Sequence, residues 1–372
     1  MTLTLSFDIL PAVEMGSERQ KTGVTIVDIA RRLGVSPMTV SRALTGNSEI
    51  SDGTRRRVLR CAQELGYRPN RWARSLVTKK SLIVGIVVPD ISHSYFAEVT
   101  RGVQEVLEKA GFSLLLCHSN LDPQKEITEI DMLAGSRTEG LIIASEQPEG
   151  SPKVFLRLRE QRVPVVLVDR FFPQHRFPCV RVDDIGVGRL AASHLLDLGH
   201  RRIAHIQGPR LSPASLRRKG FEARLRESGL SLDSELVAAG RFDVASGREA
   251  MNKLLAARRR PTAVFAGNDP MAVGAVYACR EAGLSVPHDI SVIGAGNIEG
   301  ECNPSPFLST IDWPRVELGR IAATLLVAGI ANPEQRPREE ILQPRVLARQ
   351  STARPRPSEA LSRSGVAGRG NR

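Results

Sequence analysis

Two short amphipathic segments, separated by one glycine, form the first regular pattern along the chain. Apolar residues recur at helical spacing in both segments: Ile26, Ile29, Ala30 and Leu33 in the first, and Val40 and Leu44 in the second. Gly34 lies between the segments and supplies the left-handed backbone that a tight interhelical turn requires. The pattern therefore predicts two helices joined by a sharp turn.

Polar residues mark where these helices begin. Thr25 precedes the first helix, and Asp28 is placed to return a hydrogen bond to Thr25 and to put negative charge at the positive end of the helix. Ser36 precedes the second helix, with Pro37 at the first helical position, where its missing N–H costs nothing. We therefore expect Thr25 and Ser36 to be the two caps.

A third helical pattern follows a Gly46-Asn47 turn. Its predicted apolar face consists of Val58, Leu59, Ala62 and Leu65. We expect Thr54 to cap this helix. The run Arg55 to Arg57 then falls in the first turn, against the preference of the helix dipole, and a phosphate partner would relieve that cost.

The spacing of Ala30, Gly34 and Val40 is typical of a helix-turn-helix. It leaves the exposed side of the second helix for the major groove of DNA, with the side chains Met38, Thr39, Ser41 and Arg42. A plain helical hairpin in another fold is the alternative, and the third helical segment makes it less favoured.

Beyond Lys80 the pattern changes to short β-branched or leucine-rich runs that alternate with helical stretches. Runs at 82–88, 112–117, 140–144 and 163–169 indicate one doubly wound parallel sheet. A second series has runs at 201–208, 262–269 and 289–296, with helices near 185–198, 213–228, 243–257 and 269–282. Because ligands bind beyond the carboxyl ends of parallel strands, two such lobes facing one another form a cleft for a small molecule.

Composition and charge narrow the class of protein. The 372 residues suit a small module plus a two-lobed body, and no apolar run approaches the roughly 18 residues needed to cross a bilayer. The net charge is +12, and residues 21–80 hold 13 Lys and Arg against 4 Asp and Glu. This concentration favours a nucleic-acid partner at the N-terminal end, with a merely solvated basic surface as the alternative.

The chain ends and the cysteines indicate no further chemistry. We expect residues 1–20 to be a disordered extension, in which Met15 is a second candidate start, and residues 353–372 to be a disordered basic tail. The five cysteines have neither metal-ligand nor disulfide spacing. We therefore predict no metal, no cofactor and a reducing cytoplasm.

The motifs TIVDIARRLGVSPMTVSRALTG and GYRPNRWARSL, together with the body, resemble the lactose-repressor (LacI) family from about Val24 to about Gln350. The resemblance implies an all-α helix-turn-helix domain at 23–69, a hinge helix at 70–80, and an effector-binding and dimerisation body at 81–352. This body is expected to be a periplasmic-binding-protein-like α/β fold of two doubly wound parallel-sheet lobes. Lobe 1 is predicted at about 81–182 and 314–343, and lobe 2 at about 184–312 and 344–352.

The resemblance also implies DNA contacts. Leu76, beside small Ala73, matches a leucine that the family inserts into the minor groove to kink the operator, with ordinary linker packing as the alternative. Arg42 can engage guanine bidentately and is the expected main polar reader, because Pro37 and Met38 cannot donate to a base edge. The predicted DNA-binding residues are Thr25, Ser36, Pro37, Met38, Thr39, Ser41, Arg42, Asn47, Arg55, Tyr67, Asn70, Ala73 and Leu76.

Polar and aromatic residues, several of them at strand ends, are the effector contacts and cleft residues that the resemblance implies. These are Tyr95, Phe96, Asp169, Arg217, Phe242, Asn268 and Asp269. Carboxylates and amides accept from hydroxyls, Arg clamps a carboxylate, and Phe stacks on a sugar or base. Two alternatives stay open: Asp269 as a helix cap before Pro270, and Asp169 as a strand-end turn residue.

One loop departs from the family pattern. Relatives carry Gly-Tyr-Asp-Asp or Gly-Tyr-Asp-Asn where this chain reads Gly294-Ala295-Gly296-Asn297, so the cleft loses an acidic side chain and an aromatic neighbour. The departure favours an effector that is less hydroxyl-rich, or more anionic, than a neutral sugar. Arg170 and Arg217 would suit a phosphate or carboxylate.

Together these features predict a cytoplasmic, nucleoid-associated repressor that binds palindromic operator DNA as a homodimer. A sugar or sugar derivative in the cleft either releases or strengthens that binding. The tail lacks the heptad leucines of a tetramerising coiled coil. One rival is an enzyme on a Rossmann-like body, but the chain lacks a GxGxxG strand-helix turn and no catalytic residues are predicted. The other rival is an architectural DNA-binding protein without sequence preference.

Overall fold

The computed structural model describes residues 24–67, 80–148, 150–298 and 307–356, which belong to two compact units, residues 1–80 and residues 81–372. The predicted extension at 1–20, the hinge residues Asn70, Ala73 and Leu76, and the tail from residue 357 onward lie outside the described residues. The predicted start of the disordered tail at 353 is wrong, because the Ala353 N–H donates to the Ser291 hydroxyl at 3.0 Å and Arg356 pairs with Asp289 at 2.8 Å.

The first unit contains the predicted helix-turn-helix. Its described helices are α1 (Ile26–Leu33), α2 (Pro37–Leu44) and α3 (Asp52–Glu64). The Thr25 N–H donates to the Asp28 carboxylate at 3.0 Å, and the Ser36 hydroxyl accepts from the Thr39 N–H at 3.1 Å, so both predicted caps are confirmed. Gly34 has φ +65° at the turn. The buried core is formed by Ile29, Ala30, Val40, Ala43, Val58, Cys61 and Ala62.

The third helix begins earlier than predicted. Ser51, not Thr54, caps it, because the Ser51 hydroxyl accepts from the Thr54 N–H at 3.3 Å. Asp52 therefore lies in the first turn, where the helix dipole favours a carboxylate, and Arg55 starts the basic run behind it. The prediction that Leu59 faces the core is also wrong, since its side chain is 48% exposed.

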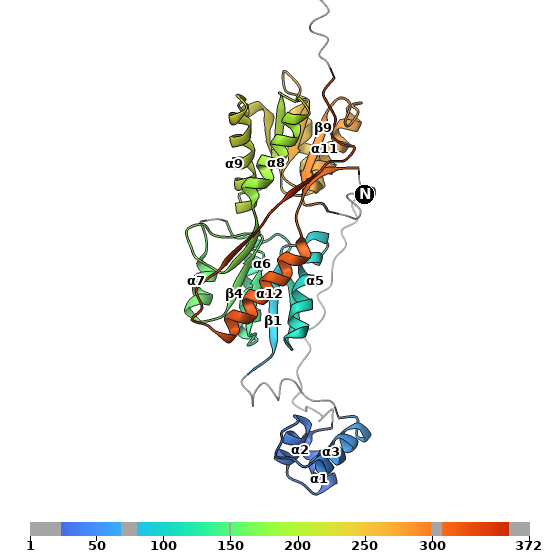
Figure 1. The fold of residues 1–372 in the computed structure, drawn as a ribbon, viewed down its shortest axis with the longest axis vertical. Coiled ribbons are helices and arrows are strands. Elements are labelled where there is room, and N and C mark those ends of the chain that lie inside the picture. The colour runs from blue at the N-terminus through green and yellow to red at the C-terminus, as the bar shows by residue number, and fades with distance from the viewer. Residues whose placement is uncertain (1–23, 68–79, 149, 299–306, 357–372) are drawn as a thin grey trace, which may run out of the picture. The chain divides into compact units, whose positions relative to one another are not determined.

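The described part of the second unit contains two six-stranded sheets, which Figure 1 shows one above the other. The first sheet is parallel throughout and has the order β11-β5-β4-β3-β1-β2. Its strands are β1 (Ile83–Val88), β2 (Ser113–His118), β3 (Gly140–Ile143), β4 (Val165–Val168), β5 (Cys179–Val182) and β11 (Glu339–Leu342). Its helices are α5 (Ser94–Lys109), α6 (Pro123–Gly135), α7 (Lys153–Glu160) and α12 (Arg315–Ala331).

The second sheet has the order β12-β10-β9-β8-β6-β7, and only the β10–β12 pair is antiparallel among its described pairs. Its strands are β6 (Ile203–Gln207), β7 (Val237–Ala239), β8 (Ala263–Ala266), β9 (Ser291–Ala295), β10 (Ser309–Asp312) and β12 (Arg345–Leu347). Its helices are α8 (Asp184–Asp197), α9 (Ser212–Glu227), α10 (Val244–Leu255) and α11 (Asp269–Glu281). The short strand β7, preceded by a 3₁₀ turn at Ser234–Leu236, was not predicted.

Helices cover both faces of each sheet. In the first sheet, Val84 and Ile86 of β1 join a buried cluster with α5 and α12, whereas Val87 joins a cluster with α6 and α7. The second sheet is covered in the same way by α8 and α9 on one face and by α10 and α11 on the other. This arrangement confirms the predicted fold class of two doubly wound parallel-sheet lobes.

Three connections run between the sheets. The chain passes from β5 to α8, from β10 to α12 and from β11 to β12, each time through one or two residues. These are the crossings that the family resemblance implied. Because the first two connections leave strands at their carboxyl ends, the loops of both sheets gather at the same gap.

Glycines allow pairs of neighbouring helices in the second unit to approach closely. A Cβ atom on Gly102 of α5 would lie 2.0 Å from the carbonyl oxygen of Val316, and one on Gly319 of α12 would lie 2.0 Å from that of Val99. Gly188 and Gly220 play the same part between α8 and α9. The backbones of paired helices are therefore in direct contact at these positions.

We predict that Gly319→Ala lowers the free energy of unfolding by about 2 kcal/mol or more, because its methyl group must displace the α5 backbone. Gly329→Ala in the same helix is the matched control, since its Cβ would meet no atom within 4 Å. The control should be neutral or stabilising by up to about 1 kcal/mol. Urea unfolding followed by circular dichroism compares the two, and equal effects would contradict the close approach.

A fully buried carboxylate holds the loop after β3. Glu126 of α6 accepts hydrogen bonds from the Ser145 hydroxyl at 2.8 Å and from the backbone N–H of Glu146. Burial raises the pKa of Glu126 to about 7, although these two hydrogen bonds and the charge of Arg170 oppose the rise. This loop carries Glu146 into the cavity described below.

We expect Glu126 to make stability depend on pH. Its pKa is about 7 in the folded chain against an ordinary value of 4.5, so the folded state binds more protons between these values and loses stability as pH rises through them. Relative to Glu126→Gln, the wild-type unfolding free energy should fall by on the order of 2 kcal/mol from pH 5 to pH 8. Urea unfolding measures both proteins at both pH values. If the difference in unfolding free energy between them is the same at pH 5 and pH 8, the prediction is contradicted.

Candidate functional site

The exposed side of α2 presents the residues predicted to read DNA. Met38 is 62% exposed, and the side chain of Arg42 is about half exposed. Ser36 and Thr39 are engaged with one another, because their hydroxyl oxygens lie 2.9 Å apart. The side chains of Met38 and Arg42 are therefore accessible on this surface.

Two of the predicted DNA-binding residues order the loop between α2 and α3. The Asn47 side chain accepts from the Glu49 N–H at 2.8 Å, and Arg55 donates to the Asn47 carbonyl oxygen at 2.8 Å. Tyr67 packs against the helical core, and burial raises its pKa. The sequence analysis missed Glu49, whose carboxylate accepts from Arg42 at 2.8 Å.

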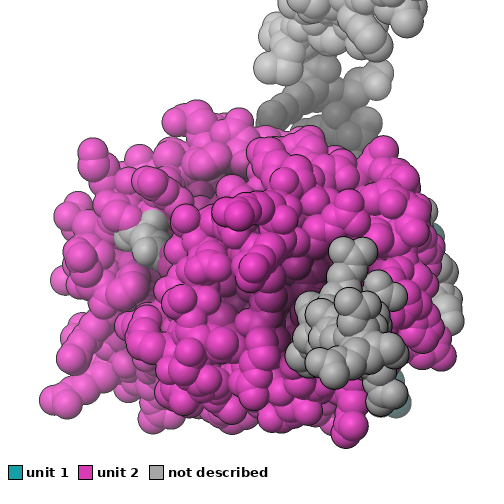
Figure 2. Space-filling model, turned by 90° about the horizontal axis from the view of Figure 1, so that it is seen from above, with its two compact units in different colours: residues 1–80 teal, residues 81–372 magenta. Residues whose placement is uncertain are grey.

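The second unit contains a cavity of about 770 Å³ between its two sheets. Figure 2 shows this unit in space-filling form, seen from above. The walls come from both lobes. Asp90, Glu146 and Asp169 follow β1, β3 and β4 of the first sheet, whereas Asn268 and Gly296 follow β8 and β9 of the second. The cavity therefore lies where the carboxyl ends of the strands meet, as expected for parallel sheets.

An aromatic wall closes one side of the cavity. Tyr95 at the start of α5 packs edge-on against Phe96 and Trp313, with ring centroids 5.0 and 6.2 Å apart. The Tyr95 hydroxyl donates to Asp169 at 2.6 Å, and burial together with the Asp169 charge raises the pKa of Tyr95 well above its ordinary value. Burial lowers the pKa of neighbouring His93, against the charges of Asp90 and Asp169.

Arg217 reaches the cavity from α9 but is already paired. Its Nε donates to Asp184 at 2.8 Å, its Nη1 donates to the Gly267 carbonyl oxygen at 2.8 Å, and its guanidinium lies 5.1 Å from the ring centroid of Trp313. Burial raises the pKa of Asp184 to about 6, and the positive charge of Arg217 opposes that rise. The Arg217 side chain therefore contacts residues at two of the crossings, Asp184 and Trp313.

The positive charge of Arg170 is also compensated by a carboxylate inside the protein. Its Nη1 donates to the Ser145 carbonyl oxygen at 2.6 Å and to the carboxylate of Glu146, and both charged side chains are about nine-tenths buried. Arg170 and Arg217 therefore each have a buried carboxylate partner that compensates their charge, and this pairing favours a neutral ligand over an anionic one. The preference for an anionic effector that the sequence suggested stays a prediction.

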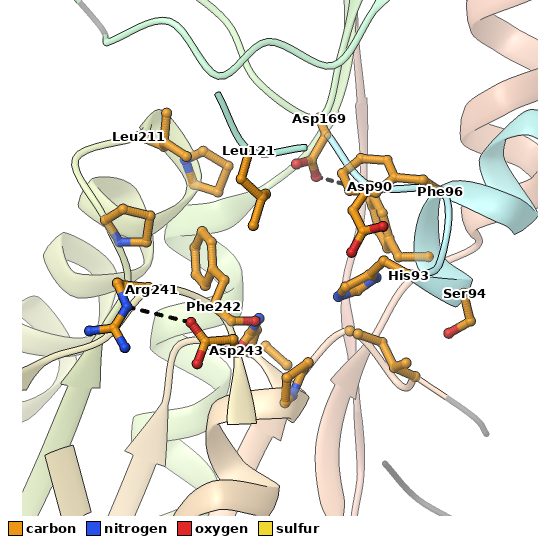
Figure 3. A pocket seen from close by; sticks show the side chains of 18 of the residues that line it. Asp90, His93, Ser94, Phe96, Leu121, Asp169, Leu211, Arg241, Phe242 and Asp243 are labelled. Atoms are coloured by element: carbon orange, nitrogen blue, oxygen red, sulfur yellow. Dashed lines mark hydrogen bonds and ion pairs between the residues drawn. The ribbon is translucent and has the colours of Figure 1, made fainter. Parts of the chain in front are cut away.

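Phe242 and Asn268 form the wall from the second lobe. In Figure 3, Phe242, Leu121 and His93 surround the open centre of the cavity. Asn268 caps α11, because its Oδ1 accepts from the Met271 N–H at 3.0 Å, and its amide donates to the Phe242 carbonyl oxygen at 2.9 Å. Asn268, rather than Asp269, is therefore the helix cap.

Asp269 does not line the cavity, and its predicted effector contact is corrected. The side chain is completely buried, and its two oxygens accept from the Thr310 hydroxyl at 2.7 Å and the Ile298 N–H at 2.8 Å. Burial raises the pKa of Asp269 to about 6, against the effect of these hydrogen bonds. Asp269 thus anchors the loop that carries Gly296.

In the loop that departs from the family pattern, residues 294–297, the polar side chain of Asn297 points away from the cavity. Asn297 donates to Asp312 at 3.1 Å and accepts from Arg349 at 2.7 Å, while Ala295 and Gly296 line the cavity. The site therefore has little polar side-chain surface here, as the sequence indicated.

Sequence reasoning missed part of the lining. Leu121 projects into the cavity with a left-handed backbone (φ 60°), and Arg241 and Asp243 flank Phe242. An apolar loop residue carries no periodic or strand-end signal. Arg241 and Asp243, in contrast, were adjacent to Phe242 and could have been included.

Comparison with known proteins gives consistent matches over both units. The sequence model described as bacterial regulatory proteins of the lacI family matches residues 25–70, and the one described as periplasmic binding proteins and sugar binding domain of the LacI family matches residues 81–350. No described helix is long and apolar enough to span a membrane.

The similar proteins are transcription regulators. Catabolite control protein A of Priestia megaterium is 34% identical, with 82% of this chain and 91% of that protein covered. The repressor CytR of Escherichia coli K12 is 35% identical, with 84% and 92% covered. The lac repressor dimer bound to operator and the anti-inducer ONPF has 27% identity and a TM-score of 0.80, with 89% and 99% covered. This chain belongs to the LacI family of bacterial regulatory proteins.

Proposed function

We propose that this protein is a transcriptional repressor that binds a palindromic operator as a homodimer and changes its operator affinity when a small neutral molecule of the sugar class fills the cavity. The observation that carries the proposal is the presence, in one chain, of a helix-turn-helix with an exposed second helix and a two-lobed body with a cavity at its strand ends. The first part reads DNA, and the second senses a metabolite.

The first unit supports sequence-specific reading. Met38 can contact a thymine methyl, and Arg42 can donate two hydrogen bonds to guanine. The Lys and Arg excess in residues 21–80 supplies phosphate contacts that do not depend on sequence. Both kinds of contact are needed, because phosphate contacts position the protein and base contacts give it specificity.

An exposed apolar strand edge supports a dimer. β2 lies at one edge of the described first sheet, and its residues Leu115 and Leu116 are 40% and 43% exposed. A hydrophobic edge strand is a template for pairing with another chain, and a second copy would cover it. A twofold dimer then presents two recognition helices to a palindromic site.

The cavity supports a neutral hydroxyl-bearing ligand. Its volume of about 770 Å³ lies in the ordinary range for small-molecule sites. Tyr95, Phe96, Phe242 and Trp313 offer apolar faces, and Asp90 contributes a carboxylate at the mouth. Sugars combine apolar faces with hydroxyl edges, and a solved relative with 30% identity and a TM-score of 0.68 is a complex of the regulator CelR with cellobiose.

The crossings explain how the ligand acts on DNA. A ligand that contacts both walls favours lobe closure, and closure bends the three connections between the lobes. Operator affinity and ligand affinity are then coupled reciprocally, with either sign. We propose that the protein catalyses no reaction, because the similar proteins are regulators. We also propose that it acts in the cytoplasm, at the nucleoid.

Selection of bound fragments from random DNA should return a palindrome. We expect the purified full-length protein, at physiological salt with competitor DNA, to enrich one motif with a twofold axis. Arg42→Ala should weaken binding to this motif by roughly tenfold or more, and binding to random DNA by only about two- to threefold, as expected for the loss of one positive charge. Enrichment without a shared motif would instead support an architectural protein.

Trp313 should report ligand binding. The chain has only one other tryptophan, Trp72, so Trp72→Phe leaves the cavity residue as the single indole emitter. We expect its fluorescence to change when the protein is titrated with a neutral mono- or disaccharide from a panel. Phe242→Ala should weaken the affinity for that sugar, measured by the same titration, by about tenfold. Sugar phosphates should give no response. A response to sugar phosphates alone would contradict the proposed ligand class.

A further inference from the structure

Arg42 is the only charged residue of α2, and a carboxylate from outside the helix holds it. Its Nη1 donates to Oε2 of Glu49 at 2.8 Å. The two side chains are 48% and 65% exposed. An exposed ion pair of this kind contributes little to folding stability, because water screens both charges. Stability therefore gives little reason for an acidic residue at this position.

The backbone around Glu49 is itself held in place. The Glu49 N–H donates to the Asn47 side chain at 2.8 Å, and the Asn47 N–H donates to the Arg42 carbonyl oxygen at 3.0 Å. Arg55 of α3 donates to the Asn47 carbonyl oxygen at 2.8 Å. These contacts tie the loop to both α2 and α3, so the Glu49 carboxylate is presented to Arg42 from an ordered backbone.

The guanidinium has donors to spare. It carries five N–H donors in a planar fork, of which a guanine uses two. Glu49 engages one terminal nitrogen, so Arg42 can contact guanine and Glu49 at the same time. A free arginine loses rotamer entropy when it is fixed, and an arginine already held by Glu49 has less to lose.

The same carboxylate opposes non-specific binding. It places a negative charge on the DNA-facing loop, where phosphate repulsion lowers affinity for any sequence. We infer that Glu49 is a positioning residue that increases the discrimination of Arg42 for guanine while it reduces affinity for random DNA. This inference rests on the proposed function, because it requires an operator that Arg42 reads.

The test uses the full-length protein and the palindrome returned by the DNA selection. Binding constants are measured by fluorescence anisotropy for four proteins: wild type, Glu49→Ala, Glu49→Gln and Arg42→Ala. The probes are the operator, a set of operators with each guanine pair replaced in turn, and a random duplex of equal length. Salt dependence is recorded for each protein.

We expect wild-type protein to lose roughly tenfold or more in affinity when the guanine read by Arg42 is replaced. Glu49→Ala should reduce this discrimination by about three- to tenfold, because the arginine is no longer held. It should also bind random DNA about two- to threefold more tightly, with a salt slope steeper by up to about 0.9. Glu49→Gln keeps an oxygen acceptor for Arg42 and should retain most of the discrimination while sharing the tighter random binding.

Glu64→Ala is the matched control. It also removes one exposed acidic partner of an arginine in this unit, Arg32, with a separation of 3.3 Å. We expect it to leave guanine discrimination unchanged. Thermal melting of each variant checks that the unit is folded, and these exposed substitutions should leave it so.

The inference is overturned if Glu49→Ala changes affinity for the operator and for the guanine-substituted operators by the same factor, since the carboxylate then acts only as a charge. It is also overturned if Arg42→Ala alters preference at no base pair. In both cases the recovered palindrome would stand and the proposed function would survive. Failure to recover any palindrome would count against the proposed function itself.

Discussion

The three crossings between the two sheets are the constraint on which the body depends. They keep the first and second lobes adjacent although each sheet is assembled from distant parts of the chain. The crossings also direct the loops at the strand ends into one gap, and the cavity forms there. Any change in the angle between the lobes must bend the same few residues, so the cavity and the relative orientation of the lobes cannot vary independently.

Buried charge is concentrated where these crossings meet. Asp184 begins α8 just after the first crossing, and Arg217 joins it to Trp313 on the second. Removing both charges from water is expensive, and such a pair is weak evidence for stability. Its position fits a different use: both residues belong to helices of the second lobe, and the pair fixes the start of α8 against α9 beside the first crossing.

Paired arginines are common to both candidate sites. Arg42 is held by Glu49 at the DNA-reading surface, whereas Arg170 and Arg217 are held by Glu146 and Asp184 at the cavity. The exposed pair leaves most of its donors available to a partner. The buried pairs compensate the charges of Arg170 and Arg217 beside the cavity. Exposure therefore decides whether a paired arginine can still reach a partner as large as DNA.

The sequence by itself determined the features that depend on neighbouring residues. Helical spacing, the Gly34 turn and the Ser36 cap specified the helix-turn-helix, and alternating runs predicted the doubly wound lobes. The start of α3 was misplaced because Ser51 and Thr54 are both good caps and local pattern does not choose between them. The family resemblance supplied six of the residues that line the cavity: Tyr95, Phe96, Asp169, Arg217, Phe242 and Asn268.

Only the tertiary structure decided which of those residues are free to bind. Asp269 is anchored by Thr310, and Arg217 by Asp184, across separations of 41 and 33 residues. Leu121 enters the cavity on a left-handed turn that no periodicity signals. A side chain's availability depends on its burial and on the partners that folding brings to it, and those partners are distant in the chain.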